Sequence, residues 1–94
     1  MGHRIELGEI EVNVNMMERI HMSCCIYDKA SDKIVLYFVG DMEMKELVTV
    51  LRDKLPRYMI PNKVIKLETM PLTANGKLDR VALKNQFEAS KKEK

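Results

Sequence analysis

The first 27 residues combine a helical spacing of apolar residues with a strict alternation. Apolar residues three or four positions apart predict a helix over residues 7–17, although Gly8 weakens that helix by about 1 kcal/mol relative to alanine. Residues 20–27 alternate between two kinds of side chain, which predicts a strand with two different faces. One face of this strand is expected to carry Ile20, Met22, Cys24 and Ile26.

The middle of the chain predicts a hairpin followed by a helix. Residues 33–40 (KIVLYFVG) are almost continuously apolar, which indicates a strand buried on both faces, and the polar turn at 28–32 favours antiparallel pairing with the preceding strand. Asp41 is a plausible N-cap for the next helix, which Pro56 ends. The apolar stripe of that helix consists of Met44, Leu47, Val48, Leu51 and Leu55.

The last part predicts a short strand, a loop and a short helix. Residues 55–61 (LPRYMIP) form a stiff connector before a strand at about residues 63–67, and a loop follows over residues 68–77. Asp79 can cap a final short helix, and residues 89–94 are expected to form a charged, flexible tail after a domain of residues 1–88. The predicted fold class is therefore α+β: a small sheet of about three strands, with an antiparallel hairpin, covered by helices.

Composition narrows the function classes. The 94 residues form one domain, too short for a large catalytic cleft between two subdomains, so the chain is expected to be one part of a larger system. A net charge of +2 with five aromatic residues gives no reason to expect nucleic-acid binding, and the C-terminal lysines are interpreted as solubilising.

The longest apolar run, residues 34–39, cannot span a membrane, and without a signal peptide the expected location is the cytoplasm. Neighbouring Cys24 and Cys25 would point to opposite faces of a strand, so a shared metal site is not expected.

Lys77 is the candidate for chemistry. It follows Asn75-Gly76, a strong turn pair because both residue types tolerate positive φ, so the lysine is expected to be presented on a sharp bend. Taken alone, the octapeptide TANGKLDR (residues 73–80) favours a solvated turn lysine over a catalytic one.

Three stretches, in this order, support a resemblance to a known family. GHRIELGEIE (residues 2–11), LPRYMIP (55–61) and NGKLDR (75–80) closely resemble the last three core motifs of adenylate-forming enzymes, above all the amino-acid adenylation domains of nonribosomal peptide synthetases. The resemblance covers residues 2 to about 87 and implies the small C-terminal subdomain of such an enzyme.

The resemblance implies a function and partners. Members of this family join a carboxylic acid to AMP, using ATP and Mg²⁺ and releasing pyrophosphate, and then pass the acyl group to a thiol, commonly the phosphopantetheine of a carrier protein. The C-terminal subdomain is a mobile lid on a large N-terminal domain, which also holds the acid-specificity pocket. This chain alone is expected to bind no cofactor and to be inactive. The alternative is a free-standing interaction module that binds a carrier protein.

The resemblance also assigns residues. Lys77 matches the family's catalytic lysine, presented by Asn75 and Gly76, and a compact cation there would stabilise charge around the α-phosphate. Gly2 and Arg4 match positions that border the pantetheine path, although Arg4 could instead pair with a neighbouring glutamate. The glutamates of the first motif are expected to hold its conformation and not to act as acids or bases; they are Glu6, Glu9 and Glu11.

Overall fold

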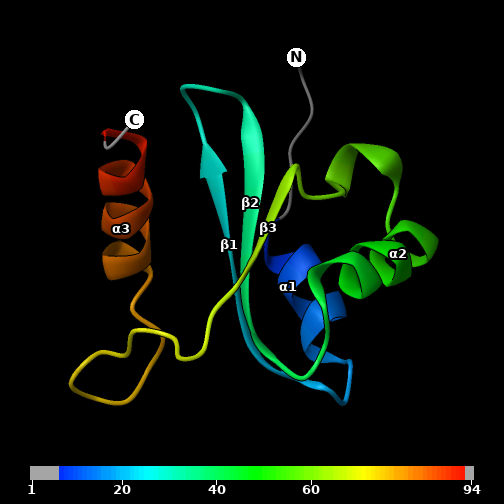
Figure 1. Cartoon of the computed structure of the whole chain (residues 1–94), viewed down its shortest axis with the longest axis horizontal. Helices are drawn as coiled ribbons and strands as arrows, with labels where there is room; N and C mark the ends of the chain where they lie inside the picture. Colours follow the sequence, from blue (N-terminus) through cyan, green and yellow to red (C-terminus); the bar gives the residue numbers. More distant parts are fainter. Residues whose placement is uncertain (1–6, 93–94) are drawn as a thin grey trace.

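A computed structural model describes residues 7–92 of the chain, and the side chains of residues 7–89. Within these residues, three α-helices and a short 3₁₀ turn surround one three-stranded sheet, which confirms the predicted α+β class (Figure 1). In chain order the elements are α1 (Leu7–Asn15), β1 (Ile20–Asp28), β2 (Lys33–Gly40), α2 (Met44–Lys54), the 3₁₀ turn η1 (Arg57–Met59), β3 (Lys63–Lys66) and α3 (Arg80–Lys92).

The sheet has the order β1-β2-β3, with β2 in the centre. β1 and β2 form the predicted antiparallel hairpin, in which Asp28 pairs with Lys33. β3 runs parallel to β2, with Val35 opposite Lys63. Parallel neighbours cannot be joined by a tight turn, and here α2 and η1 supply the crossover between the two strands. The sheet is therefore mixed.

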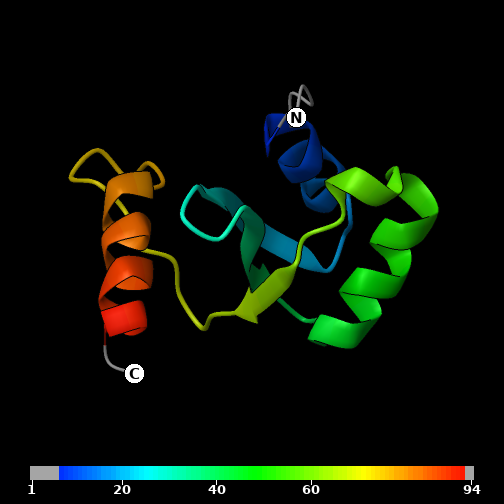
Figure 2. The same cartoon turned by 90° about the horizontal axis from the view of Figure 1, so that it is seen from above.

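Helices cover both faces of the sheet, which explains the continuous apolar run of β2. α1 and α2 lie on one face and α3 lies on the other (Figures 1 and 2). Because side chains alternate along a strand, Phe38 points towards α1 and α2 while Tyr37 points towards α3. The core thus has two parts. The buried residues on the side of α1 and α2 are Ile10, Val14, Ile20, Cys25, Ile34, Leu36, Phe38, Met42, Leu47, Leu51, Leu55 and Met59; those on the side of α3 are Cys24, Ile26, Val35, Tyr37, Met70, Leu83 and Phe87.

A bulge at the start of β1 corrects one prediction. Ile20 pairs with Gly40 and Met22 pairs with Val39, so His21 is an extra residue in the ladder. The extra residue reverses the alternation, and Ile20 packs on the side of α1 and α2 while Met22 packs on the side of α3. The expectation that Ile20 shares a face with Met22 is therefore wrong. Beyond the bulge, Cys24 and Cys25 do lie on opposite faces, as predicted.

The N-cap prediction for α2 is also wrong. The N-cap position is Glu43, whose side chain makes no capping hydrogen bond, and not Asp41. Asp41 instead extends the end of the sheet, because its amide donates to the Arg19 carbonyl oxygen at 2.8 Å. Met42 is buried in the core immediately afterwards, and the helix begins two residues later, at Met44.

The other element ends agree with the predictions to within a few residues. α1 ends at Asn15, although Met17 still packs against the core. Asp79 caps α3 as predicted, since its Oδ1 accepts a hydrogen bond from the Ala82 amide at 3.0 Å. α3 continues to Lys92, past the start of the predicted tail at residue 89. The division into residues 1–88 and 89–94 stays a prediction.

Candidate functional site

The turn that carries Lys77 is built by Thr73. The Thr73 amide donates to the Lys77 carbonyl oxygen at 2.7 Å, and the Gly76 amide donates back to the Thr73 carbonyl oxygen at 2.9 Å. The Thr73 hydroxyl oxygen accepts from the Lys77 amide at 3.2 Å. Gly76 has φ +81°, in the left-handed region where glycine pays no steric penalty. Lys77 is exposed, and among the described residues it forms no ion pair.

The base of this loop is tied to the domain at several points. Leu72 and Leu78 form an antiparallel bridge, and the Asp79 amide donates to the Pro71 carbonyl oxygen at 3.0 Å. Met70, just before the loop, is buried on the side of α3. The loop extends beyond the sheet between β3 and α3, where Figure 1 draws it in yellow and orange. The Lys77 turn is therefore exposed at its tip and fixed at its base.

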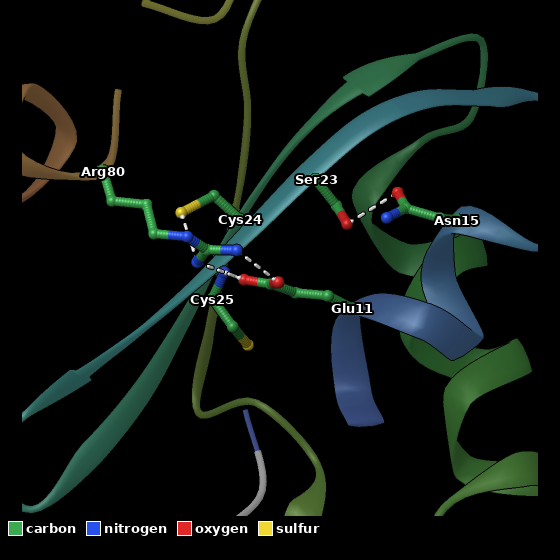
Figure 3. Close-up of polar contacts among 6 residues, drawn as sticks. All are labelled: Glu11, Asn15, Ser23, Cys24, Cys25 and Arg80. Carbon is green, nitrogen blue, oxygen red and sulfur yellow. Dashed lines mark hydrogen bonds and ion pairs between the residues drawn. The ribbon is translucent and has the colours of Figure 1, made fainter. Parts of the chain in front are cut away.

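Arg80 joins the end of this loop to α1. Its Nη1 lies 2.7 Å from Glu11 Oε2 and its Nη2 lies 2.7 Å from Glu11 Oε1, so the ion pair is bidentate (Figure 3). Glu11 Oε2 also accepts a hydrogen bond from the Cys25 amide at 2.6 Å. These contacts support the expectation that Glu11 holds the conformation of its segment.

The same contacts determine the electrostatics around the cysteines. Burial, with a smaller contribution from the Glu11 charge, raises the pKa of the Cys25 thiol to about 12. Burial also raises the pKa of the Cys24 thiol, against the lowering effect of Arg80, whose Nη1 lies 3.4 Å from the Cys24 sulfur. Hydrogen bonding to Glu11 raises the pKa of Arg80 further above its usual value. Both cysteines are thus protonated near neutral pH and unsuited to act as nucleophiles.

The remaining sequence predictions about sites are placed as follows. Gly2, Arg4 and Glu6 lie outside the described residues. No group of three or more histidine, cysteine, aspartate or glutamate side chains in the described part of the chain could hold a metal ion. None of the helices within residues 7–92 has the length and hydropathy of a membrane crossing.

Two contacts that support the candidate site could not be predicted from the sequence motifs. Thr73 acts through its hydroxyl group within the turn, and Glu11 meets Arg80 although 69 positions separate them in the chain. The position of Arg80 at the end of NGKLDR marks it as part of the motif. A sequence pattern could not name its partner, because the first motif contains three glutamates.

We expect Thr73→Val to loosen the turn without changing its shape. Valine keeps the volume of threonine but offers no acceptor to the Lys77 amide, so hydrogen exchange at that amide should become about two- to tenfold faster, the scale of one ordinary hydrogen bond. NMR-detected exchange would measure this change. Thr69→Val is the matched control, since Thr69 is exposed and lies outside the turn. Unchanged exchange at Lys77 would contradict the assigned contact.

Comparison with known proteins gives a consistent result. No protein-family model matches the chain. Klebsiella oxytoca NpsA, solved in complex with 3-hydroxyanthranilyl-AMSN, superimposes with a TM-score of 0.83 at 28% identity, covering 92% of this chain and 18% of NpsA. A four-domain nonribosomal peptide synthetase bound to AMP and glycine superimposes with a TM-score of 0.74 at 39% identity, covering 86% of this chain and 6% of that one. Gramicidin S synthase 2 of Brevibacillus brevis is 43% identical over 90 residues, which are 89% of this chain and 2% of the synthase.

Fold and sequence together define the class: the chain corresponds to the C-terminal subdomain of adenylate-forming, AMP-binding enzymes, as the three motifs predict. Within that class its matches include nonribosomal peptide synthetases, among them gramicidin S synthase 2 and the four-domain synthetase. The chain spans 10% or less of the length of the curated relatives it matches first.

Proposed function

We propose that this subdomain is the mobile lid of a ligase that activates an amino acid with ATP and then supports transfer of the acyl group to the thiol of a carrier protein. The observation that carries the proposal is Lys77, an exposed cation on a turn that hydrogen bonds fix at its base. Such a side chain can reach into a neighbouring domain while its backbone stays in place. The proposed partners are an N-terminal adenylation domain and a carrier protein bearing phosphopantetheine, and the proposed location is the cytoplasm.

The chemistry explains why the group should be a lysine. A carboxylate that attacks the α-phosphate of ATP brings like charges together, and negative charge grows on the phosphate oxygens in the transition state. An ammonium group placed there lowers the barrier electrostatically, without transferring a proton. In this proposal Mg²⁺ is bound with ATP in the larger domain. Lys77 would supply the positive charge that the lid adds to that site.

For the second step of the reaction, the transfer of the acyl group to the carrier thiol, the proposal involves Gly2 and Arg4. We propose that they border the path of the pantetheine arm, where the small size of glycine leaves room and the guanidinium group can contact a phosphate. This part rests on the resemblance of residues 2–11 to the family's motif.

A deletion experiment tests the proposed function. In the full-length ligase, meaning this subdomain together with its N-terminal domain, we expect ATP–pyrophosphate exchange that depends on an amino acid. We expect no measurable exchange from the 94-residue chain alone or from the ligase lacking it, because a lid contributes groups to a site that it does not build. Exchange would be measured for all three proteins with a panel of amino acids. Exchange by the isolated chain, or undiminished exchange without it, would refute the lid assignment.

A further inference from the structure

The ion pair between Glu11 and Arg80 connects two layers of the domain that the sheet separates. β1 is an edge strand, and the Cys25 amide points off that edge to the Glu11 carboxylate at 2.6 Å. Figure 3 shows Arg80 reaching past β1 from the start of α3 to the same carboxylate on α1. The pair therefore covers the free edge of β1 at Cys25 and joins α1 to α3 around it.

The geometry of the pair makes it a fixed connection. Both guanidinium contacts are 2.7 Å long, and the two parallel bonds restrict the orientation as well as the distance. Glu11 is only 8% exposed, so its carboxylate has little contact with water and is stabilised by Arg80 and the Cys25 amide. The ion pair between Arg19 and Glu46 has the same 2.7 Å distance, and the two arginine side chains are similarly exposed, at 53% for Arg19 and 56% for Arg80. The pairs differ in the glutamate side chain, which is 44% exposed in Glu46 and 10% in Glu11, in the number of contacts, and in what they connect.

Arg80 also lies at the C-terminal end of the Lys77 loop. It directly follows Asp79, which closes the base of the loop through Pro71 and caps α3. Arg80 lies three positions after Lys77, so the chain between them can span at most about 10 Å. A small rotation at the start of α3 would therefore move the lysine appreciably. Misplacement of a catalytic group by about 1 Å can cost up to about 10²-fold in rate.

We infer that Arg80 is a positioning residue: by its bidentate pair with Glu11 it holds the Lys77 turn at a set place relative to α1 and the first motif. This inference rests on the proposed function of Lys77. It adds that the last residue of the NGKLDR motif serves the lysine at a distance, through the GHRIELGEIE motif, and does not itself touch the reacting groups.

Arg80→Met in the full-length ligase is the direct test. Methionine keeps much of the length and apolar character of the arginine side chain but makes no ion pair. We expect kcat for adenylation to fall about tenfold while KM for the amino acid and for ATP changes little, because the substrates remain bound by the other domain. Arg80→Lys should recover part of the loss, since one contact of the two can form. Arg19→Met, which breaks the exposed pair, should leave kcat within about twofold.

Two further variants separate positioning from damaged folding. Glu11→Gln keeps an acceptor for the Cys25 amide but removes the charge that binds Arg80, so it should reproduce the effect of Arg80→Met with little change in folding. In a Lys77→Ala background, Arg80→Met should cause almost no additional loss, because the group that it positions is absent. Full additional loss in that background would overturn the inference, as would an effect of Arg80→Met no larger than that of Arg19→Met.

The outcomes distinguish this inference from the proposed function. If Lys77→Ala slows adenylation but Arg80→Met and Glu11→Gln do not, the positioning role is wrong and the catalytic lysine stands. If Lys77→Ala itself leaves adenylation unchanged, both are wrong. If Arg80→Met fails to fold, Glu11→Gln and Arg80→Lys decide the question by the same kcat measurements.

Discussion

Lys77→Ala should slow adenylation by at least about 10²-fold in the full-length ligase, the scale expected when one preorganised electrostatic group is removed from a transition state. Transfer of the acyl group from a supplied acyl-adenylate to the carrier thiol should suffer much less. In the proposed mechanism the lid rotates between the two steps, and the turn at Asn75 and Gly76 then leaves the site with its lysine. Removing Lys77 should therefore affect one half-reaction selectively.

Single-turnover kinetics of each half-reaction would measure this selectivity. Lys77→Arg should restore adenylation only in part, because a planar guanidinium group does not place its charge where a compact ammonium group does. Lys84→Ala is the matched control, since Lys84 is an exposed lysine on α3 and should be neutral in both steps. Equal losses in both half-reactions would contradict the two-orientation mechanism. An unchanged adenylation rate would make Lys77 an ordinary solvated lysine.

Phe38→Ala should lower the free energy of unfolding by about 3–5 kcal/mol, the cost of emptying a fully buried aromatic site. Phe38 lies in the central strand, is 0% exposed and packs in the core between the sheet and the two helices α1 and α2. A domain of this size is stable by only about 5–15 kcal/mol in total, so the variant should lose a large share of its stability.

Urea or guanidinium denaturation of the chain would measure the effect on the midpoint. Val81→Ala is the matched control, because Val81 on α3 is 70% exposed and its truncation should change stability by no more than about 0.5 kcal/mol. A loss below about 1 kcal/mol for Phe38→Ala would mean that the core on the side of α1 and α2 is not packed as described.

Local patterns were enough to predict most of the elements. Each of these elements is marked by the spacing of apolar residues within a short stretch of chain. Examples are the alternation in residues 20–27, the apolar run in 33–40 and the one-sided stripe that includes Leu47 and Leu51. The bend at Gly76 and the cap at Asp79 are likewise short-range, because each depends on atoms within a few residues. For the same reason the sequence pointed to Lys77.

Other features were decided by contacts between distant segments. The bulge that turns Ile20 to the other face depends on how β1 pairs with the end of β2. Asp41 is hydrogen-bonded to Arg19, 22 positions away, and the N-cap position of α2 is Glu43. β3 pairs parallel to β2 only because α2 carries the chain across the sheet. The choice of Glu11 as the partner of Arg80 is of the same kind.

The sequence by itself therefore determined which segments form helices and strands and which residue stands on the exposed turn. The tertiary structure alone decided how that turn is held. The physical reason is distance along the chain: periodicity, turns and caps are governed by interactions within about four residues, whereas 69 positions separate the carboxylate of Glu11 from the guanidinium group of Arg80. Only the packing of α1 and α3 on opposite faces of the sheet brings those two groups to the same edge of β1.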